Sequence, residues 1–453
     1  MKKCILFNPP SSVSVYSKSK IRAAVPRLPV MSLAMIAASL IEEGIDVSII
    51  DLSAFCANDI WQQVRSRILD FEPDMVGVTS TTPLFYEASR ISQIAKSVSR
   101  NILTIIGGPH ASSLPQEVLR ESSFDIAVVG EGEQIIKKIA RGQKVSKIIE
   151  KGGELPIEDL PFPALHLFDI NNYSCPGMIA RNNPVGPIEM SRGCVFNCTF
   201  CNKTVHGRKF RIKSAKRVVE ELFILKKLGY REFHVLDDQF TTDISKAKEI
   251  CEAIIRSNIN MTWNLRTGVR VDRIDDEFLK LARKAGCYQV GVGFESGCQE
   301  MLDKINKGIT IEQAFRASRM IKKAGLELVG FFMLGFPGET ERSINKTIDF
   351  AIRLNPDFAK ATIMVPFPGT SIYDEYKQQG LIKTQDWACY NFHNPSQIYQ
   401  HDTLSWDKLN FYYNDFHRRF YLRPSFLIKK LFKSSIQGRL FVDFAYGYQT
   451  FRK

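Results

Sequence analysis

The chain has 453 residues, of which 44% are hydrophobic and 24% are charged, and its net charge is +13. This length is too great for one ordinary domain, and the composition excludes a disordered or collagen-like chain. No apolar run approaches the roughly 18 residues that a membrane-spanning helix needs. The first residues, MKKCILFNPP, lack the long apolar core of a signal peptide. We therefore expect a cytoplasmic protein.

Residues 1–145 alternate short apolar, β-branched runs with amphipathic stretches such as MSLAMIAASLIEEG. The runs are CILFN at Cys4 and the segments 47–52, 75–80, 102–108 and 124–130. Runs bounded by Gly, Pro or Asp are typical of buried parallel strands, and the stretches between them are typical of helices. Five βα units in a row predict an α/β domain with a doubly wound, Rossmann-like parallel sheet.

Small and flexible residues follow the third, fourth and fifth of these strands. In such a sheet the loops lie side by side at the carboxyl ends of the strands, where ligands bind. Glycines there let a flat or phosphate-bearing ligand approach the backbone, although a simple tight turn is the alternative interpretation. The candidate ligand-binding residues are Thr79, Ser80, Gly107, Gly108, Pro109, His110, Gly130, Glu131 and Gly132.

Residues 146–186 are rich in proline and predict a linker that packs along both domains. A second βα series occupies residues 187–385, with helical stretches such as SAKRVVEELFILKKLG. Six strands are too few for a closed eight-stranded barrel, so we expect a partial (β/α)6 TIM-like barrel with chemistry at the carboxyl ends of its strands. The predicted strands are 187–193, 232–238, 261–267, 288–296, 328–336 and 357–366.

Three of the ten cysteines, Cys194, Cys198 and Cys201, stand together directly after the first of these strands. Three thiolates within eight residues indicate a metal site. A structural zinc site takes four protein ligands, and His206 is the candidate for the fourth. An iron–sulfur cluster held by three cysteines instead leaves one iron open to a substrate or cofactor. The residues alone leave both interpretations open.

The Cys-x3-Cys-x2-Cys spacing, with Phe200 before the last cysteine, resembles the radical S-adenosylmethionine (SAM) superfamily. The stretches LDDQFTTD, GVGFESG, GFFMLGFPGET and VPFPGT resemble the same family, and PRLPVMSLAMIAASL with GGPHAS resembles the cobalamin-binding domain of one branch. The resemblance covers about residues 1–375. It implies a 4Fe–4S cluster on the three cysteines, SAM on the fourth iron, and cobalamin in the N-terminal domain. It also implies an external electron donor of the flavodoxin or ferredoxin type.

In this family, reductive cleavage of SAM gives a 5′-deoxyadenosyl radical that abstracts hydrogen from an unactivated carbon. The resemblance places Asp237 and Asp238 at the SAM ammonium, although these residues also suit a helix N-cap region. It places Glu295 at the ribose hydroxyls and Arg266 at the SAM carboxylate, with a structural ion pair as the alternative for Arg266. It also implies that the backbone around Gly330 and Gly335 contacts the adenine of SAM.

The sequence differs from some cobalamin-binding domains in one motif. In those domains, the histidine of an Asp-x-His-x-x-Gly motif ligates cobalt from below. The sequence has no such motif, and His110 is the only histidine of the N-terminal domain. We expect bound cobalamin to lack a histidine below the cobalt, which favours the cob(I) state that accepts a methyl group.

The expected function is therefore cobalamin-dependent methylation of an unactivated carbon in a small or lipid-like substrate. A radical enzyme that forms or rearranges a ring, like the anaerobic magnesium-porphyrin ester cyclases, is the alternative. Methylthiolation would need a second cysteine triad, but Cys4, Cys56 and Cys175 lie on different predicted elements. The non-enzymatic alternative is a zinc-stabilised basic binding protein.

Residues 386–453 predict a helical segment rich in aromatic and basic residues, with a break at Pro424. From Arg418 to Lys453 it holds nine Lys or Arg residues and one acidic residue, so most of the net charge belongs to this tail. The tail is interpreted as a helix that closes over the barrel, with peripheral docking on an anionic membrane as the alternative. We expect no nucleic-acid partner, because no RNA-binding module is present. The FYLRP stretch of this tail resembles the tails of those radical SAM family members that act on porphyrin or hopanoid-like substrates.

Overall fold

A computed structural model describes residues 1–11, 26–54, 59–143, 148–177, 179–392 and 395–428. The N-terminal domain contains a parallel sheet in the order β2-β1-β3-β4-β5-β6. Its strands are β1 (Lys3–Asn8), β2 (Asp46–Asp51), β3 (Met75–Thr79), β4 (Leu103–Gly107), β5 (Ile126–Val129) and β6 (Ile148–Lys151). The five predicted strands are confirmed, and β6 is an addition that lies in the predicted linker. The strand order reverses between β1 and β3, which marks a ligand-binding switch point.

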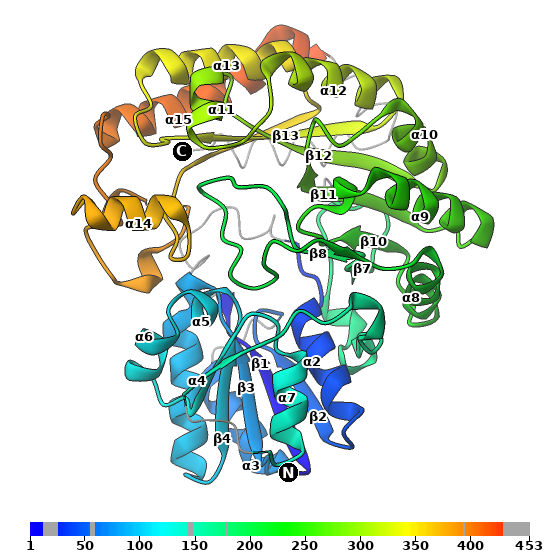
Figure 1. Cartoon of the computed structure of the whole chain (residues 1–453), viewed down its shortest axis with the longest axis vertical. Helices are drawn as coiled ribbons and strands as arrows, with labels where there is room; N and C mark the ends of the chain where they lie inside the picture. Colours follow the sequence, from blue (N-terminus) through cyan, green and yellow to red (C-terminus); the bar gives the residue numbers. More distant parts are fainter. Residues whose placement is uncertain (12–25, 55–58, 144–147, 178, 393–394, 429–453) are drawn as a thin grey trace.

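Helices cover both faces of this sheet, as Figure 1 shows. Alternate residues of the strands explain why: Leu6 packs with the helices of one face, and its neighbours Ile5 and Phe7 pack with those of the other. A sheet buried on both faces needs mostly apolar residues in its central strands, as β1, β3, β4 and β5 have. The helices are α2 (Met31–Ile41), α3 (Ile60–Phe71), α4 (Phe85–Val98), α5 (Pro109–Ser113), α6 (Pro115–Arg120) and α7 (Glu133–Ala140).

The second domain is a curved six-stranded parallel sheet in the order β14-β13-β12-β11-β10-β7, with helices along its outer face (Figure 1). This confirms the predicted partial barrel. Its strands are β7 (Val185–Ile188), β10 (Glu232–Val235), β11 (Thr262–Val269), β12 (Cys287–Glu295), β13 (Glu327–Leu334) and β14 (Phe358–Ile363). Its helices are α8 (Ala215–Lys227), α9 (Ile244–Ser257), α10 (Asp276–Lys284), α11 (Gln299–Lys304), α12 (Ile311–Lys323), α13 (Glu341–Leu354) and α14 (Ser371–Gln378).

The chain leaves the barrel sheet earlier than the sequence predicts. Strand β7 ends at Ile188, and a short strand β8 (Ser191–Arg192) then pairs antiparallel with β9 (Arg211–Ile212). The segment between β8 and β9, residues 193–210, contains the three clustered cysteines and is called the cysteine loop below. The β8–β9 pair closes the base of this loop beside the carboxyl ends of the barrel strands.

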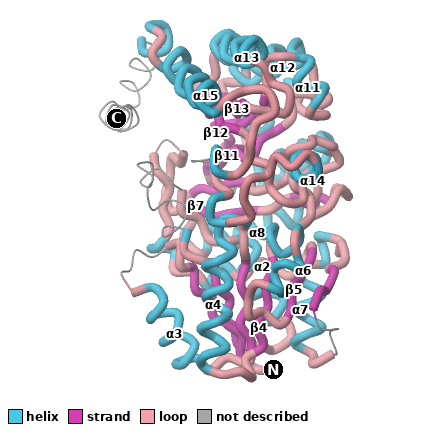
Figure 2. Tube along the Cα trace, turned by 90° about the vertical axis from the view of Figure 1, so that its left-hand side faces the viewer, coloured by secondary structure: helices cyan, strands magenta, loops and turns pink. Residues whose placement is uncertain are grey.

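The segment from Leu160 to Ala164 connects the two domains through contacts with both. The Ala164 amide donates to the Ala34 carbonyl of α2 at 3.0 Å, and the Arg217 guanidinium of α8 donates to the Leu160 carbonyl at 2.8 Å. This segment is thus hydrogen-bonded to the N-terminal domain at Ala164 and to the barrel at Leu160. Figure 2 shows the N-terminal domain and the barrel stacked along the long axis of the molecule.

Helix α15 (Trp406–Tyr421) packs on the outside of the barrel, as the closing-helix interpretation of the tail predicts. Its Tyr421 hydroxyl donates to the Ala359 carbonyl of β14 at 2.7 Å, and its Phe416 ring lies 5.3 Å from Phe332. The rest of the basic tail, residues 429–453, lies outside the described residues. Within the described residues, no helix has the length and apolarity that a bilayer crossing demands.

Candidate functional site

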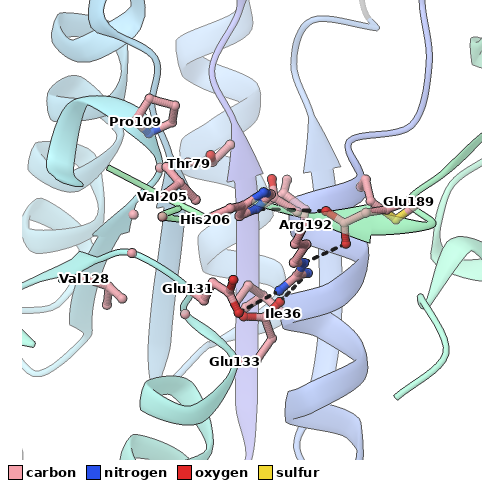
Figure 3. Close-up of a pocket in the computed structure, with 18 of the residues that line it drawn as sticks. Ile36, Thr79, Pro109, Val128, Glu131, Glu133, Glu189, Arg192, Val205 and His206 are labelled. Carbon is pink, nitrogen blue, oxygen red and sulfur yellow. Dashed lines mark hydrogen bonds and ion pairs between the residues drawn. The ribbon is translucent and has the colours of Figure 1, made fainter. Parts of the chain in front are cut away.

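A cavity of about 510 Å³ lies between the carboxyl ends of the N-terminal sheet and the cysteine loop. Figure 3 shows side chains from both domains around it, among them Thr79, Pro109 and Glu131 of one domain and Val205 and His206 of the other. Apolar side chains such as Leu6 and Ile36 form much of the remaining wall. The cavity lies where the switch-point rule predicts a ligand.

At the end of β4, two glycines leave the backbone exposed to this cavity, with no side chain between them. A side chain at Gly107 would begin in open space, with no atom within 4 Å of its Cβ. Gly108 has φ +95, and a Cβ there would lie 2.9 Å from the Ser80 carbonyl oxygen, so this turn requires glycine. The two glycines therefore let a broad, mostly apolar group lie directly against the backbone, which fits a corrin ring.

Most of the predicted ligand-binding residues of the N-terminal domain line this cavity, but Ser80 and His110 do not. His110 is fully buried among aromatic rings, 4.7 Å from Phe85 and 5.2 Å from Trp387 between ring centroids. Burial lowers its pKa to about 4. Among the residues that the structure describes, His206 is the histidine that lines the cavity, and it comes from the barrel side. The predicted residues in the lining are Thr79, Gly107, Gly108, Pro109, Gly130, Glu131 and Gly132.

The cysteine loop forms the opposite wall, where Cys194 and Cys201 line the cavity. Cys198 is close by, since the Cys201 amide donates to its carbonyl at 3.2 Å. Burial raises the pKa of Cys201 to about 11, and the nearby Lys203 acts in the opposite direction, while the other two cysteines raise it further. Three neighbouring thiols ionise together only when a cationic metal centre compensates their charge. The donor set therefore fits a metal cluster.

The described residues do not gather three His, Cys, Asp or Glu side chains tightly enough to hold a single metal ion. His206, the candidate fourth zinc ligand, forms an ion pair with Asp238 at 3.0 Å. This pair raises the pKa of His206, although burial opposes the shift, and the same bond lowers the pKa of Asp238 against the effect of its burial.

The adjacent carboxylates Asp237 and Asp238 point to different places. Asp238 lines the cavity, whereas Asp237 is fully enclosed and accepts hydrogen bonds from the Met190 amide at 2.7 Å and the Ser191 hydroxyl at 2.5 Å. Burial raises the pKa of Asp237 to about 8, although these two bonds act to lower it. Asp237 thus fixes the segment between β7 and β8, from which the cysteine loop starts.

The remaining predicted SAM-binding residues lie in the barrel and do not line the cavity. Glu295 ends β12 with φ +62, and its carboxylate pairs with Lys307 at 2.8 Å. The same lysine lies 5.8 Å from the centre of the Phe200 ring, beside Cys201. These contacts join Glu295 to the cysteine loop. The other predicted residues are Arg266 on β11, Gly330 on β13 and Gly335 just after β13.

Sequence reasoning missed a buried group of charges beside the cavity, and Figure 3 shows Arg192 with its glutamate partners. The Arg192 guanidinium pairs with Glu189 at 2.7 Å, with Glu133 at 2.7 Å and with Glu131 at 3.2 Å. Arg211 also pairs with Glu131. Glu131 and Glu133 belong to the N-terminal domain and the other three residues to the barrel, so this group joins the domains. The GEGE and SRGC motifs contain most of these residues, but their pairing depends on long-range contacts.

Two family models match the chain: the radical SAM superfamily over residues 188–351, and the B12 binding domain over residues 21–140. A protein of Pyrococcus horikoshii named as an uncharacterized methyltransferase is 33% identical, over 89% of this chain and 90% of its own length. The anaerobic magnesium-protoporphyrin IX monomethyl ester cyclase of Rubrivivax gelatinosus is 32% identical, over 82% of this chain and 70% of its own.

Two solved structures share the fold of both domains. OxsB, a cobalamin-dependent SAM radical enzyme with aqua-cobalamin and SAM bound, gives a TM-score of 0.71 at 18% identity and covers 91% of this chain and 66% of its own. The methyltransferase TsrM of Kitasatospora setae, with cobalamin and a 4Fe–4S cluster bound, gives 0.67 at 20% identity and covers 84% of this chain and 78% of its own. The arrangement of a B12-type domain against a radical SAM barrel is thus shared.

Proposed function

This chain belongs to the radical SAM superfamily, in the branch with an N-terminal B12-binding domain, and we propose that it is a cobalamin-dependent methyltransferase acting on an unactivated carbon. One observation carries the proposal: the cavity that fits a corrin ring is bounded by Cys194 and Cys201. A group held on the glycines of β4 and a group held on the cysteine loop would therefore be neighbours. The relative of Pyrococcus horikoshii that is named a methyltransferase supports methyl transfer.

The cysteines would hold the cluster, and the glycine-lined cavity would hold cobalamin. When bound, the cluster and SAM supply the radical that removes hydrogen, and cobalamin supplies the methyl group. The chain's own residues position these groups: the ion pairs of Arg192 and Arg211 hold the two domains together, and Asp237 fixes the start of the cysteine loop. With both groups bound, the apolar wall would leave little room for water between them.

Ring formation without methyl transfer is the second candidate, because the Rubrivivax gelatinosus cyclase is nearly as similar as the methyltransferase. Both reactions begin with the same radical. They differ in whether SAM would also serve as the methyl donor. For either reaction, we propose a one-electron donor of the flavodoxin or ferredoxin type.

The experiment is mass spectrometry of SAM products after anaerobic reconstitution of the full chain with iron, sulfide, cobalamin and a strong reductant. The methyltransferase proposal predicts 5′-deoxyadenosine together with S-adenosylhomocysteine, and the latter only when cobalamin is present. Deoxyadenosine alone would favour the cyclase. Neither product, in protein that contains zinc and no iron, would contradict both.

A further inference from the structure

Two aromatic residues of the cysteine loop are each covered by a cation from the barrel. Phe196 lies between the first two cysteines of the loop, and Phe200 lies directly before the third. The Arg270 guanidinium, just after β11, is 3.7 Å from the centre of the Phe196 ring, and the Lys307 ammonium is 5.8 Å from the centre of the Phe200 ring. Both distances are within the range of a cation–π interaction. The barrel thus contacts the loop through residues next to the cysteines.

One turn between α11 and α12 joins these contacts. Its Ile305 carbonyl accepts a hydrogen bond from the Thr199 amide of the cysteine loop at 3.1 Å. Arg270 donates to two further carbonyls of the same turn, Lys307 at 2.6 Å and Gly308 at 3.2 Å. Arg270 therefore fixes the first aromatic ring of the loop directly, and it fixes the part of the loop that contains the second ring through this turn.

The charge of Arg270 is held away from water beside this loop. Its side chain is 8% exposed, whereas that of its carboxylate partner, Asp272 at 2.9 Å, is 19% exposed. Water therefore screens the negative charge of Asp272 more than the positive charge of Arg270. A guanidinium stays protonated in a protein, so this positive charge is permanent. It favours any negative charge that develops on the cysteine loop.

We propose that Arg270 positions the cysteine loop and raises the reduction potential of the 4Fe–4S cluster that the loop holds. The inference rests on the proposed function, because it needs the cluster. One electron from the flavodoxin- or ferredoxin-type donor reduces the cluster, no bond forms or breaks in that step, and the cluster becomes more negative by one charge. A nearby buried cation stabilises the reduced state more than the oxidised state, and local charge is one of the factors that set such potentials.

The test is the midpoint potential of the cluster in the reconstituted full chain, measured without SAM or substrate by anaerobic redox titration with EPR detection. Arg270→Gln removes the charge and keeps hydrogen-bond donors. It should lower the equilibrium constant for one-electron reduction by about tenfold or more, which corresponds to about 59 mV. Arg270→Lys keeps the charge without the planar fork, and its equilibrium constant should stay within about threefold of the parent value.

Arg217 provides a matched control outside the cysteine loop, because its contacts are of the same kinds as those of Arg270. Its guanidinium lies 3.6 Å from the centre of the Phe162 ring and donates to the Leu160 carbonyl at 2.8 Å. It also pairs with Glu221 at 2.9 Å, and its side chain is 12% exposed. Arg217→Gln should lower the free energy of unfolding, as Arg270→Gln does, and leave the potential of the cluster unchanged.

Asp272→Asn tests the charge from the opposite direction. It removes the negative partner and keeps Arg270, so it should raise the equilibrium constant for reduction, and it carries the test if Arg270→Gln does not retain iron. An unchanged potential in iron-loaded Arg270→Gln, an equal fall in Arg217→Gln, or a fall in Asp272→Asn would overturn the proposal and leave the proposed function standing. A parent protein that takes up no cluster would contradict the proposed function itself, and this inference with it.

Discussion

Arg192 of the barrel and Glu133 of the N-terminal domain form a buried ion pair at 2.7 Å, with both side chains no more than 6% exposed. The pair crosses the contact between the domains at the wall of the cavity. Burial is the largest single influence on the pKa of Glu133 and raises it, but the charge and the hydrogen bond of Arg192, with smaller contributions from other groups, together shift the pKa downward. The position of the cysteine loop relative to the glycines of β4 thus depends on charges held away from water.

Arg192→Met should destabilise the protein by about 3–5 kcal/mol, because it leaves three buried glutamates without their shared cation. The free energy of unfolding in urea measures this. Arg120→Met is the control, since the Arg120 side chain is 70% exposed and pairs on the surface, and it should change little. Equal effects of the two substitutions would show that the buried group does not hold the domains together.

Cys198→Ala should abolish the formation of 5′-deoxyadenosine and lower the iron content, while the circular dichroism spectrum stays that of the parent. The change removes one of three cluster ligands without disturbing a buried core residue. The matched variant is Cys389→Ala, which alters a partly exposed cysteine outside the cysteine loop. Deoxyadenosine at the parent rate from Cys198→Ala would contradict the cluster assignment.

Gly107→Phe should block cobalamin binding without unfolding the domain. The new side chain would start in open space and extend into the cavity. We expect the affinity for cobalamin, measured by its visible absorbance after gel filtration, to fall by at least about tenfold. Gly107→Ala adds only a methyl group and should retain binding. Normal binding by the phenylalanine variant would show that cobalamin lies elsewhere.

Asp237→Asn should gain stability relative to the parent as the pH rises from 6 to 9. Burial raises the folded-state pKa of Asp237 from 3.8 to about 8, so between these values the folded protein binds a proton that the unfolded chain has lost. The free energy of unfolding of the parent therefore falls as pH rises through this window, and the asparagine variant lacks this term. Urea unfolding at both pH values measures the difference. A constant difference between variant and parent would contradict the assignment, and Asp46→Asn, at an exposed position of β2, serves as the control.

The sequence predicted both sheets because each strand is a short apolar run with clear ends. It did not predict β6, which has only four residues and lies in the proline-rich segment, or β8 and β9, because two-residue strands leave no periodic pattern. Gly107 ends β4 as predicted, whereas the cysteines follow the short strand β8 and not the barrel strand predicted over residues 187–193. Adjacent residues can also face opposite ways. Asp237 and Asp238 show this, since one is enclosed and the other lines the cavity. Pro109 and His110 are a second such pair: Pro109 lines the cavity, whereas His110 packs among aromatic rings.

The interdomain charges could not be predicted, because they depend on how the two sheets face each other. Arg192 and Glu133 are far apart in the chain, and no local pattern distinguishes them from solvent-exposed charges.

The most direct test follows the methyl group itself. The reconstituted protein is incubated anaerobically with reductant and SAM that carries a trideuterated methyl group, and the bound cobalamin is then analysed by mass spectrometry. The account predicts trideuteromethyl on the cobalamin of the parent protein, and none recovered with Gly107→Phe. Cobalamin that stays bound and unlabelled while 5′-deoxyadenosine accumulates would contradict methyl transfer.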